Sequence, residues 1–249
     1  MIKNKKPFIS IVVPCFNEER TIKELLLKII SNCKKYKIEV IVVDDKSTDH
    51  SVKIISKLIK SHPVIKLFKH TKNQGKGAAL RTAFERLSNS DITVIQDADL
   101  EYDPSEYHKL FEPILKHNAD VVYGSRFLSG SVTRVLYFWH SFANGLLTLL
   151  SNIFTNLNLT DMETCYKVFK TKIIKKIKVE ENRFGFEPEI TAKLSKMNIV
   201  FYEVGISYHG RTYDEGKKIG IKDAIRALVC ILKYNIFSGD FVLPLPVYK

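Results

Sequence analysis

The stretch VIQDADLEYDP, residues 94–104, runs from apolar residues directly into a cluster of acidic ones. Asp97, Asp99 and Glu101 occupy every second position, so in an extended segment their carboxylates would all point the same way. Carboxylates gathered in one place repel one another unless a proton or a counter-charge accompanies them. Their hard oxygen atoms suit Mg²⁺ or Mn²⁺, which proteins hold through one or two carboxylates together with phosphate oxygens. The cluster therefore predicts a divalent-cation site.

The segments around this cluster alternate between apolar runs and helical patterns. Strands are expected at residues 8–16, 38–45, 64–70, 91–99 and 119–125, and helices at 21–36, 47–62, 75–88 and 104–117. Strands that alternate with helices are typical of a parallel sheet covered on both faces. The sequence thus predicts an α/β, Rossmann-like fold with a mostly parallel sheet and helices on both faces.

The alternation weakens after residue 126. The segments expected there are a helix at 135–154, a strand at 166–170, a helix at 187–197, a strand at 199–208 and a helix at 221–236. No linker separates the two halves of the chain. We therefore expect a single domain over residues 1–249, with a Rossmann-like half at 8–125, a specialised half at 126–236 and a tail at 237–249.

Polar clusters follow five successive expected strands: NEE, DD, NQGKG, DADLE and GSR. In open α/β sheets the ligand crevice lies at the carboxyl ends of the strands, so these clusters are expected to meet there. DD offers Asp44 and Asp45, and a carboxylate in this position can accept hydrogen bonds from a nucleobase or a ribose, as in dinucleotide-binding folds. Lys76 and Arg81 could face an anion near a helix start, or the glycines beside Lys76 could simply shape that start. Because Walker A and GxGxxG motifs are absent, ATPase and NAD chemistry are not expected.

The chain carries a net charge of +12. This excess fits either a polyanionic partner or lysines scattered over solvated helix faces, and nucleic acid is disfavoured because no basic motif is interleaved with aromatics. The four cysteines form no CxxC pair, and no apolar segment of roughly 7–15 residues precedes the first strand. Free thiols and a cytoplasmic location are therefore expected. The apolar window 135–154 carries polar residues, so it is expected to be buried or interfacial rather than membrane-spanning.

The segments VVPCFNEE, VVDDKSTD, QDADLE and YGSRF stand in an order and spacing that resemble glycosyltransferase family 2 enzymes of the GT-A fold. Within that family the chain resembles the polyprenyl- and dolichyl-phosphate sugar transferases, such as dolichol-phosphate mannose synthase. The resemblance implies inverting transfer of a hexose from a UDP- or GDP-linked sugar to a polyprenyl phosphate, with Mg²⁺ or Mn²⁺ as cofactor. It also implies a peripheral position at the inner face of a membrane, reached through the chain's own surface or through a small membrane subunit.

The resemblance assigns roles to the residues that match the family's motifs. Contacts to the nucleotide sugar are expected from Pro14, Phe16, Glu18, Val43, Asp45, Asp97, Ala98, Asp99, Arg211 and Lys217. The metal ligands would be Asp97, Asp99 and Glu101. The acceptor side would be formed by Arg126, Arg134, His140 and Asn144. Catalysis, through stabilisation of the leaving diphosphate and positioning of the acceptor, is expected from Asp99, Arg126, Arg211 and Lys217.

Two alternatives remain open from the sequence. If the acceptor is a saccharide hydroxyl in cell-envelope polysaccharide or glycolipid assembly, a carboxylate base is necessary, and the candidates are Asp161, Glu187 and Glu189. A phosphate acceptor is already an anion and needs no base. From another class, a receiver-like or nucleotide-binding module without catalysis would also place paired acids after a parallel strand, but it would leave DADLE and the second half unexplained.

Overall fold

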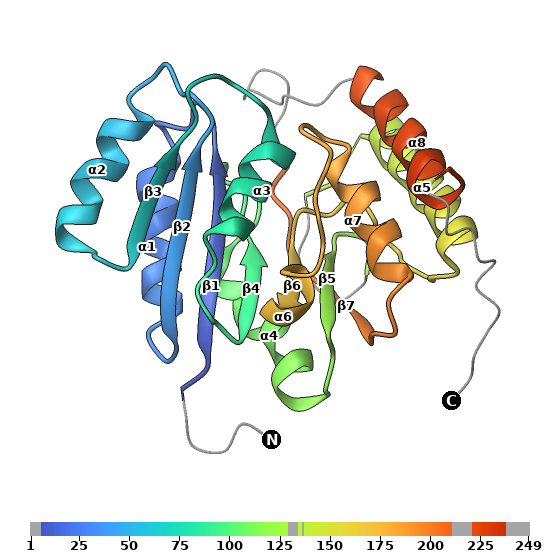
Figure 1. The fold of residues 1–249 in the computed structure, drawn as a ribbon, viewed down its shortest axis with the longest axis horizontal. Helices are drawn as coiled ribbons and strands as arrows, with labels where there is room; N and C mark the ends of the chain where they lie inside the picture. The colour runs from blue at the N-terminus through green and yellow to red at the C-terminus, as the bar shows by residue number, and fades with distance from the viewer. Residues whose placement is uncertain (1–5, 129–133, 136, 211–220, 238–249) are drawn as a thin grey trace.

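The computed structural model describes residues 6–128, 134–135, 137–210 and 221–237. Within them the chain forms a seven-stranded sheet covered by helices on both faces (Figure 1). The strands are β1 (Phe8–Cys15), β2 (Lys37–Asp44), β3 (Ile65–Lys69), β4 (Ile92–Ile95), β5 (Val121–Ser125), β6 (Lys167–Lys170) and β7 (Phe201–Gly205). Their order across the sheet is β3-β2-β1-β4-β6-β5-β7. The predicted α/β architecture is confirmed.

The sheet is mostly parallel, with one reversed strand. β1 pairs in parallel with β2 and β4, β2 with β3, and β5 with β7. β6 is antiparallel to both of its neighbours, β4 and β5. Every expected strand is present, but the sequence pattern did not indicate the direction of β6, because that direction depends on where the chain re-enters the sheet rather than on local periodicity.

The helices also follow the expected order. They are α1 (Ile22–Asn32), α2 (Ser51–Ser61), α3 (Lys76–Glu85), η1 (Pro104–Glu106), α4 (Tyr107–Lys116), α5 (Phe138–Thr155), α6 (Thr171–Ile174), α7 (Phe186–Ser195) and α8 (Ile221–Asn235). Each predicted helix is confirmed. The single turn α6, which directly follows β6, was not predicted.

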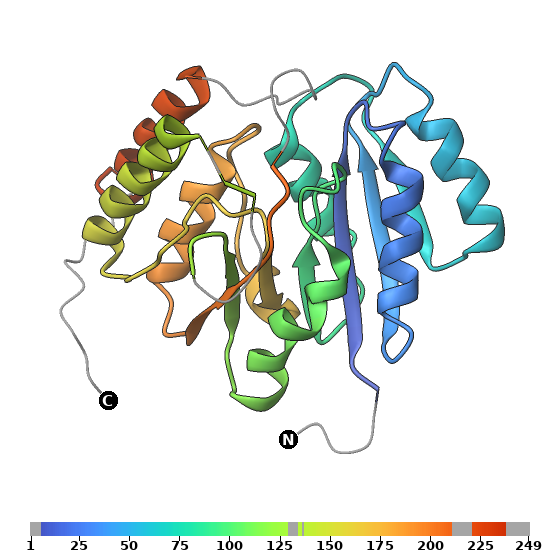
Figure 2. The same ribbon diagram turned by 180° about the vertical axis from the view of Figure 1, so that it is seen from behind.

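Two hydrophobic cores lie on opposite faces of the sheet. In β1, Ile11 and Val13 point into one core and Val12 points into the other, as strand alternation requires. Helices α1, α2 and α4 cover the first face, and α3, α6 and α7 cover the second (Figure 2). Because both faces are covered, the central strands read as continuous apolar runs.

The acidic segment after β4 is a turn and not part of the strand. β4 ends at Ile95, whereas the sequence favoured a strand as far as residue 99. The Gln96 side chain fixes the turn, since its amide donates to the carbonyls of Asp97 and Tyr102 and its oxygen accepts from Tyr107 and Tyr166 hydroxyls. The expectation of an extended segment was therefore wrong.

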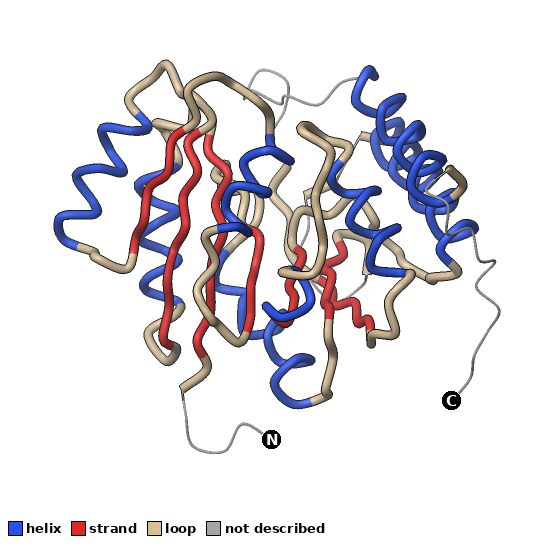
Figure 3. The backbone as a smooth tube through the Cα atoms, viewed as in Figure 1, coloured by secondary structure: helices blue, strands red, loops and turns tan. Residues whose placement is uncertain are grey.

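Helices α5 and α8 lie side by side at the β7 end of the molecule, away from β1, β2 and β3 (Figure 3). α5 exposes an apolar stripe formed by Phe138, Phe142, Leu146, Leu149 and Ile153. α8 exposes a second one formed by Ile225, Leu228 and Val229. Among the helices of the described residues, none combines the length and the apolar character needed to cross a bilayer.

Candidate active site

Three loops at the carboxyl edge of the sheet carry non-glycine residues in the left-handed backbone region. They are Asn17 (φ 54°) after β1, Lys46 (φ 67°) after β2 and Leu100 (φ 63°) after β4. Such residues are uncommon, most of all for a bulky side chain such as leucine, and strained backbone of this kind gathers at functional sites. The edge on which the sequence places its polar clusters is therefore also the edge where the backbone is most constrained.

The two acids at the end of β2 have different surroundings. Asp45 is saturated: His70 Nδ1 lies 2.7 Å from its Oδ1, and the Gln74 and Gly75 N–H groups donate to its carboxylate at 2.9 and 2.6 Å. Asp44 is 2% exposed and keeps Oδ1 without a hydrogen-bond partner in the described part of the chain. Asp44 is therefore the acid of this pair with an unpartnered carboxylate oxygen, whereas the family resemblance assigns the nucleoside contact to Asp45.

The remaining residues expected to hold a nucleoside lie around the same edge. Pro14 and Phe16 are half-buried where β1 ends. Glu18 is buried, and its backbone N–H donates to Ser51 Oγ at 2.9 Å. Val43 is fully buried in the core, so its side chain has no surface to offer a ligand.

Hydrogen bonds tie the acidic turn to α1 and to the segment after β7. The Thr21 hydroxyl, at the start of α1, donates to the carbonyl of Ala98 at 2.8 Å. Asp99 accepts the N–H of Glu101 at 3.1 Å, and the Tyr208 hydroxyl donates to Glu101 at 2.6 Å. Burial and the Glu101 charge raise the pKa of Tyr208, so this hydroxyl remains a donor.

Asp97 is paired with a cation of the protein itself. Lys76 Nζ lies 3.0 Å from Asp97 and 3.0 Å from Glu187, and 2.9 Å from Cys165 Sγ. Burial lowers the pKa of Lys76, but the two carboxylates outweigh it and hold the pKa well above its usual value. Lys76 is therefore charged and supplies the counter-charge that the carboxylate of Asp97 needs.

The expected three-carboxylate metal site is not assembled in advance. In the parts of the chain that the structure describes, no three His, Cys, Asp or Glu side chains converge on a point that could hold a metal ion. Asp97 is paired with Lys76, Asp99 accepts the Glu101 N–H, and Glu101 accepts the Tyr208 hydroxyl. Two hard oxygen donors still fit Mg²⁺ or Mn²⁺, since such ions take the rest of their ligands from phosphate oxygens and water.

The glycines of NQGKG serve a close backbone contact. Gly75 has φ 100°, and a Cβ on Gly77 would collide with the Glu181 carbonyl oxygen. Arg81 braces the same loop, because its guanidinium donates to the Asn182 side chain at 2.8 Å. These contacts support a structural role for the two glycines and for Arg81 at the start of α3.

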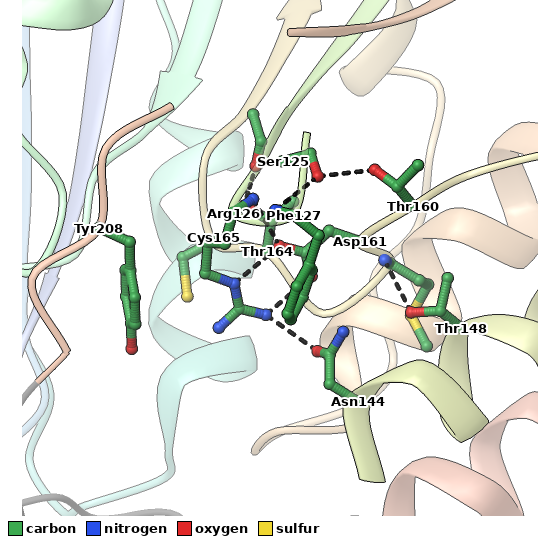
Figure 4. Close-up of polar contacts among 12 residues, drawn as sticks. Ser125, Arg126, Phe127, Asn144, Thr148, Thr160, Asp161, Thr164, Cys165 and Tyr208 are labelled. Atoms are coloured by element: carbon green, nitrogen blue, oxygen red, sulfur yellow. Dashed lines mark hydrogen bonds and ion pairs between the residues drawn. The ribbon is translucent and has the colours of Figure 1, made fainter. Parts of the chain in front are cut away.

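Arg126, directly after β5, is held in a bidentate ion pair. Its Nε and Nη2 donate to the two oxygens of Asp161 at 2.7 Å each, and Nη2 also donates to Asn144 Oδ1 at 2.9 Å (Figure 4). Its guanidinium carbon lies 5.2 Å from the centroid of the Tyr208 ring. Burial lowers the pKa of Arg126, but fully buried Asp161 outweighs that effect and raises it. The arginine therefore joins β5, the loop before β6 and helix α5.

Arg134 and His140, also expected on the acceptor side, contact different segments of the chain. Arg134 binds the segment that follows β7, since its N–H donates to the Tyr208 carbonyl and its guanidinium to the Gly210 carbonyl, both at 3.1 Å. His140 packs edge-on against Tyr137 at the start of α5. Arg211 and Lys217 lie outside the described residues.

Each of the three candidate bases forms at least one ion pair with a cation of the protein. Asp161 is bound by Arg126 and Glu187 by Lys76. Glu189 accepts the N–H groups of residues 180 and 181 at 2.7 and 2.8 Å and pairs with Lys193 at 2.6 Å. These contacts make Glu189 a structural residue.

A fourth carboxylate, which the sequence reasoning missed, lies in the same region. Glu163 keeps Oε1 buried without a hydrogen-bond partner in the described residues. Burial, and then the charge of Glu187, raise its pKa to about 8. Glu163 belongs to the segment TDMETCYK, in which only Asp161 was considered, and its lone position gave no periodic signal.

A mostly parallel α/β sheet with an acidic turn after β4 and a buried arginine after β5 defines a GT-A glycosyltransferase. The chain matches the family model described as Glycosyl transferase family 2 over residues 10–178 and belongs to that family. The expectation drawn from the sequence motifs is confirmed.

Several curated relatives carry the names of polyprenyl- or dolichyl-phosphate sugar transferases. The chain is 28% identical over 217 residues to a dolichol-phosphate mannosyltransferase of Pyrococcus furiosus, an alignment that covers 85% of this chain and 60% of that protein. It is 26% identical to a dolichyl-phosphate beta-glucosyltransferase of Dictyostelium discoideum, covering 88% of this chain and 72% of that one. The chain thus spans about 60% of the length of the first of these relatives.

A solved structure shares the fold. Glucosyl-3-phosphoglycerate synthase from Mycobacterium tuberculosis, crystallised with Mn²⁺, uridine diphosphate and glucosyl-3-phosphoglycerate, superimposes with a TM-score of 0.67 at 19% identity. The match covers 92% of this chain and 80% of that one. At this identity the likeness establishes the GT-A fold.

Proposed function

We propose that the chain transfers a hexose from a UDP- or GDP-linked sugar to a polyprenyl or dolichyl phosphate, with inversion at the anomeric carbon. The printed names of the two curated relatives support this acceptor class. The GT-A neighbour crystallised with uridine diphosphate and Mn²⁺ supports a nucleotide-sugar donor and a divalent cation.

The state of the acceptor-side carboxylates carries the proposal. Asp161 and Glu189 are bound at both carboxylate oxygens, so neither is poised to take a proton from a hydroxyl. Glu187 is paired with Lys76 through Oε1, and its Oε2 has no partner in the described residues. Burial and the charge of Glu187 raise the pKa of Glu163 to about 8, which disfavours its carboxylate form at neutral pH. A sugar hydroxyl needs a base to become a nucleophile, whereas a phosphate monoester is an anion already. The arrangement therefore favours a phosphate acceptor.

Arg126 and Asn144 would receive that phosphate. Asp161 occupies Nε and Nη2 of Arg126, and Asn144 Nδ2 is buried without a partner in the described residues. An unpaired amide donor beside a fixed guanidinium suits an anion, because charge-assisted hydrogen bonds are the strong ones. Asp161 would thus act as a positioning residue that orients Arg126.

On the donor side, Asp44 would accept a hydrogen bond from the nucleoside. Asp99 and Glu101 would hold Mg²⁺ or Mn²⁺, and the bound ion supplies positive charge where negative charge develops on the leaving diphosphate. Arg211 and Lys217, outside the described residues, are predicted to face the same charge.

We further propose that the apolar stripes of α5 and α8 rest on a membrane surface. Phe142 and Leu149 are each 56% exposed, and Phe138 and Trp139 at the start of α5 are 69% and 73% exposed. Aromatic side chains are typical of the lipid–water interface. Because Asn144 lies on the same helix as this stripe, a lipid-bound acceptor would need to travel only a short distance to reach Arg126.

The proposal is tested by measuring hexose transfer to a polyprenyl phosphate directly. The chain is incubated with UDP- and GDP-hexoses, Mn²⁺ and a polyprenyl phosphate, and the glycolipid product is followed by mass spectrometry for wild type and Asp99→Ala. One donor should yield product, and the variant should lose at least about a hundredfold in rate, the size of effect expected when charge stabilisation is removed. Product formed on a saccharide hydroxyl, with none on the lipid phosphate, would refute the acceptor assignment.

A further inference from the structure

The Tyr208 side chain contacts both the acidic turn and the arginine of the acceptor side. Its hydroxyl donates to Glu101 Oε2 at 2.6 Å, and the guanidinium carbon of Arg126 lies 5.2 Å from the centroid of its ring (Figure 4). Tyr208 is 6% exposed, so both contacts are largely shielded from water. One buried ring therefore lies against a residue proposed to bind the divalent cation and against the residue proposed to receive the acceptor phosphate.

The ring has little freedom to move. The Tyr102 ring packs against it with centroids 5.2 Å apart, and a Cβ added at Gly210 would come within 2.6 Å of a Tyr208 ring carbon. The Arg134 N–H donates to the Tyr208 carbonyl at 3.1 Å, which fixes the backbone of the residue as well. These contacts determine where the hydroxyl lies.

The residues on either side of Tyr208 are fastened to the acidic turn and to η1, which follows it. The Ser207 N–H and hydroxyl donate to Glu106 Oε2 at 2.7 and 2.8 Å. The His209 N–H donates to the Glu101 carbonyl at 3.0 Å, so Glu101 accepts from this segment through its backbone as well as its side chain. The hydroxyl contact is thus part of a fixed register between the two segments.

A hydrogen bond of this kind prepares a carboxylate for a cation. A carboxylate has about four acceptor positions on its two oxygens, so Glu101 can bind a metal ion while it accepts from Tyr208. Hydrogen bonds to metal-binding side chains fix their orientation, and their loss typically lowers metal affinity about 10–100-fold. The face of an aromatic ring also attracts a guanidinium group, and more strongly where water is excluded. Tyr208 therefore holds Glu101 and Arg126 by two different interactions.

We propose that Tyr208 is a positioning residue that couples the cation site to the acceptor site. Its hydroxyl orients Glu101 for the divalent cation, and its ring holds the Arg126 guanidinium in place for the acceptor phosphate. Because the ring is closely packed, a movement of either residue is passed on to the other rather than absorbed. A ligand at one site thus stabilises the arrangement that the other site requires, and each ligand should raise the affinity of the other. This role rests on the proposed function, because it places a cation at Glu101 and a phosphate at Arg126.

The test compares Tyr208→Phe with Tyr102→Phe. The first removes the hydroxyl that binds Glu101 and keeps the ring beside Arg126. The second, the matched control, removes the hydroxyl of the adjacent buried ring, which accepts the N–H of Cys165 at 3.2 Å. The Kd of Mn²⁺ is measured from the paramagnetic resonance signal of the free ion with saturating UDP or GDP, in the absence and in the presence of farnesyl phosphate. A titration without protein corrects for Mn²⁺ bound directly by the nucleotide and by farnesyl phosphate.

In wild type, farnesyl phosphate should lower the Kd of Mn²⁺ by at least about fivefold, the lower limit usual for coupled sites. Tyr208→Phe should bind Mn²⁺ about 10–100-fold more weakly, and farnesyl phosphate should no longer change its Kd. Without Mn²⁺, Tyr208→Phe should bind farnesyl phosphate as wild type does, because the ring is kept. Tyr102→Phe should match wild type in the Kd of Mn²⁺ and in the effect of farnesyl phosphate.

Three results would count against this role. A Tyr208→Phe variant that binds Mn²⁺ as tightly as wild type, or equal losses in the two variants, would overturn the positioning of Glu101. A wild-type Kd of Mn²⁺ that farnesyl phosphate leaves unchanged would overturn the coupling, and this measurement needs no variant to fold. Each of these results leaves the proposed function standing. Failure of wild type to bind any nucleoside diphosphate in the presence of Mn²⁺ would instead refute the proposed function, and the coupling with it.

Discussion

At the scale of single residues, function depends on which of several chemically similar groups is already occupied. Asp44 and Asp45 are adjacent and identical in type, yet only Asp44 has a carboxylate oxygen without a partner in the described residues. The residue pattern identified the pair, and the family resemblance favoured Asp45. The difference in their hydrogen bonds depends on His70, Gln74 and Gly75, some 25 to 30 residues further on. The same holds for Asp97, whose partner Lys76 comes from the start of α3.

The two acids should respond oppositely to the same isosteric change. Asp45→Asn replaces an acceptor that binds several donors, so we expect a loss of roughly 1–3 kcal/mol in the free energy of unfolding. Asp44→Asn removes no hydrogen bond at Oδ1, so stability should change little while affinity for the nucleoside diphosphate falls. Urea unfolding and calorimetric titration of both variants measure the two effects. Equal affinity loss in both would show that the free oxygen of Asp44 is not the ligand contact.

At the scale of secondary structure, the sequence predicted what local periodicity controls. Apolar runs and helical spacing predicted every strand of the described chain, and every helix except the single turn α6. The end of β4 was missed because the turn after Ile95 is held by Gln96 and two distant tyrosine hydroxyls, Tyr107 and Tyr166. The direction of β6 was missed for the same kind of reason, since pairing between distant segments leaves no periodic trace in either of them.

The start of α3 provides a prediction at this scale. By helix propensity alone, Gly77→Ala should stabilise the chain by at most about 1 kcal/mol. The Cβ would instead meet the Glu181 carbonyl oxygen, a backbone atom that cannot move away cheaply, so we expect a lower melting temperature. Gly145→Ala in α5 is the matched control, because a Cβ there has no neighbour within 4 Å. A Gly77 variant at least as stable as the Gly145 variant would contradict the close approach.

At the scale of the whole molecule, the exposed apolar stripes lie together at one end. Phe142→Glu and Leu149→Glu should abolish flotation with vesicles that contain anionic lipid, because each places a charge where acyl chains would lie. Leu27→Glu, an exposed apolar position on α1 (39% exposed), is the matched control and should float like wild type. Wild type that fails to float with any vesicle would refute direct docking and favour a membrane subunit.

The pH dependence of stability should reveal the raised pKa of Glu163. The pKa of Glu163 rises from the usual 4.5 to about 8 on folding, so between these values the folded chain binds one more proton than the unfolded chain. Stability from this group is therefore complete below pH 4.5 and is lost as pH rises towards 8. The groups that act on it are Glu187 and Asp161, which raise its pKa, and Lys167 and Arg126, which lower it.

The variant Glu163→Gln removes that titration. Between pH 5 and pH 8, the melting temperature of the variant relative to that of wild type should rise as the pH increases. Parallel profiles for the two proteins would mean that Glu163 titrates normally in the folded state.

The reversed strand β6 limits how the chain can be divided. It lies between β4 and β5, so a cut after Ser125 would leave those two strands in one fragment with a gap one strand wide between them. Neither fragment could close its own sheet, and bare strand edges promote aggregation. Fragments 1–125 and 126–249, produced separately, should precipitate, whereas their co-expression should yield a reassembled pair. An insertion or a tag is therefore better placed elsewhere than at the boundary between the two halves.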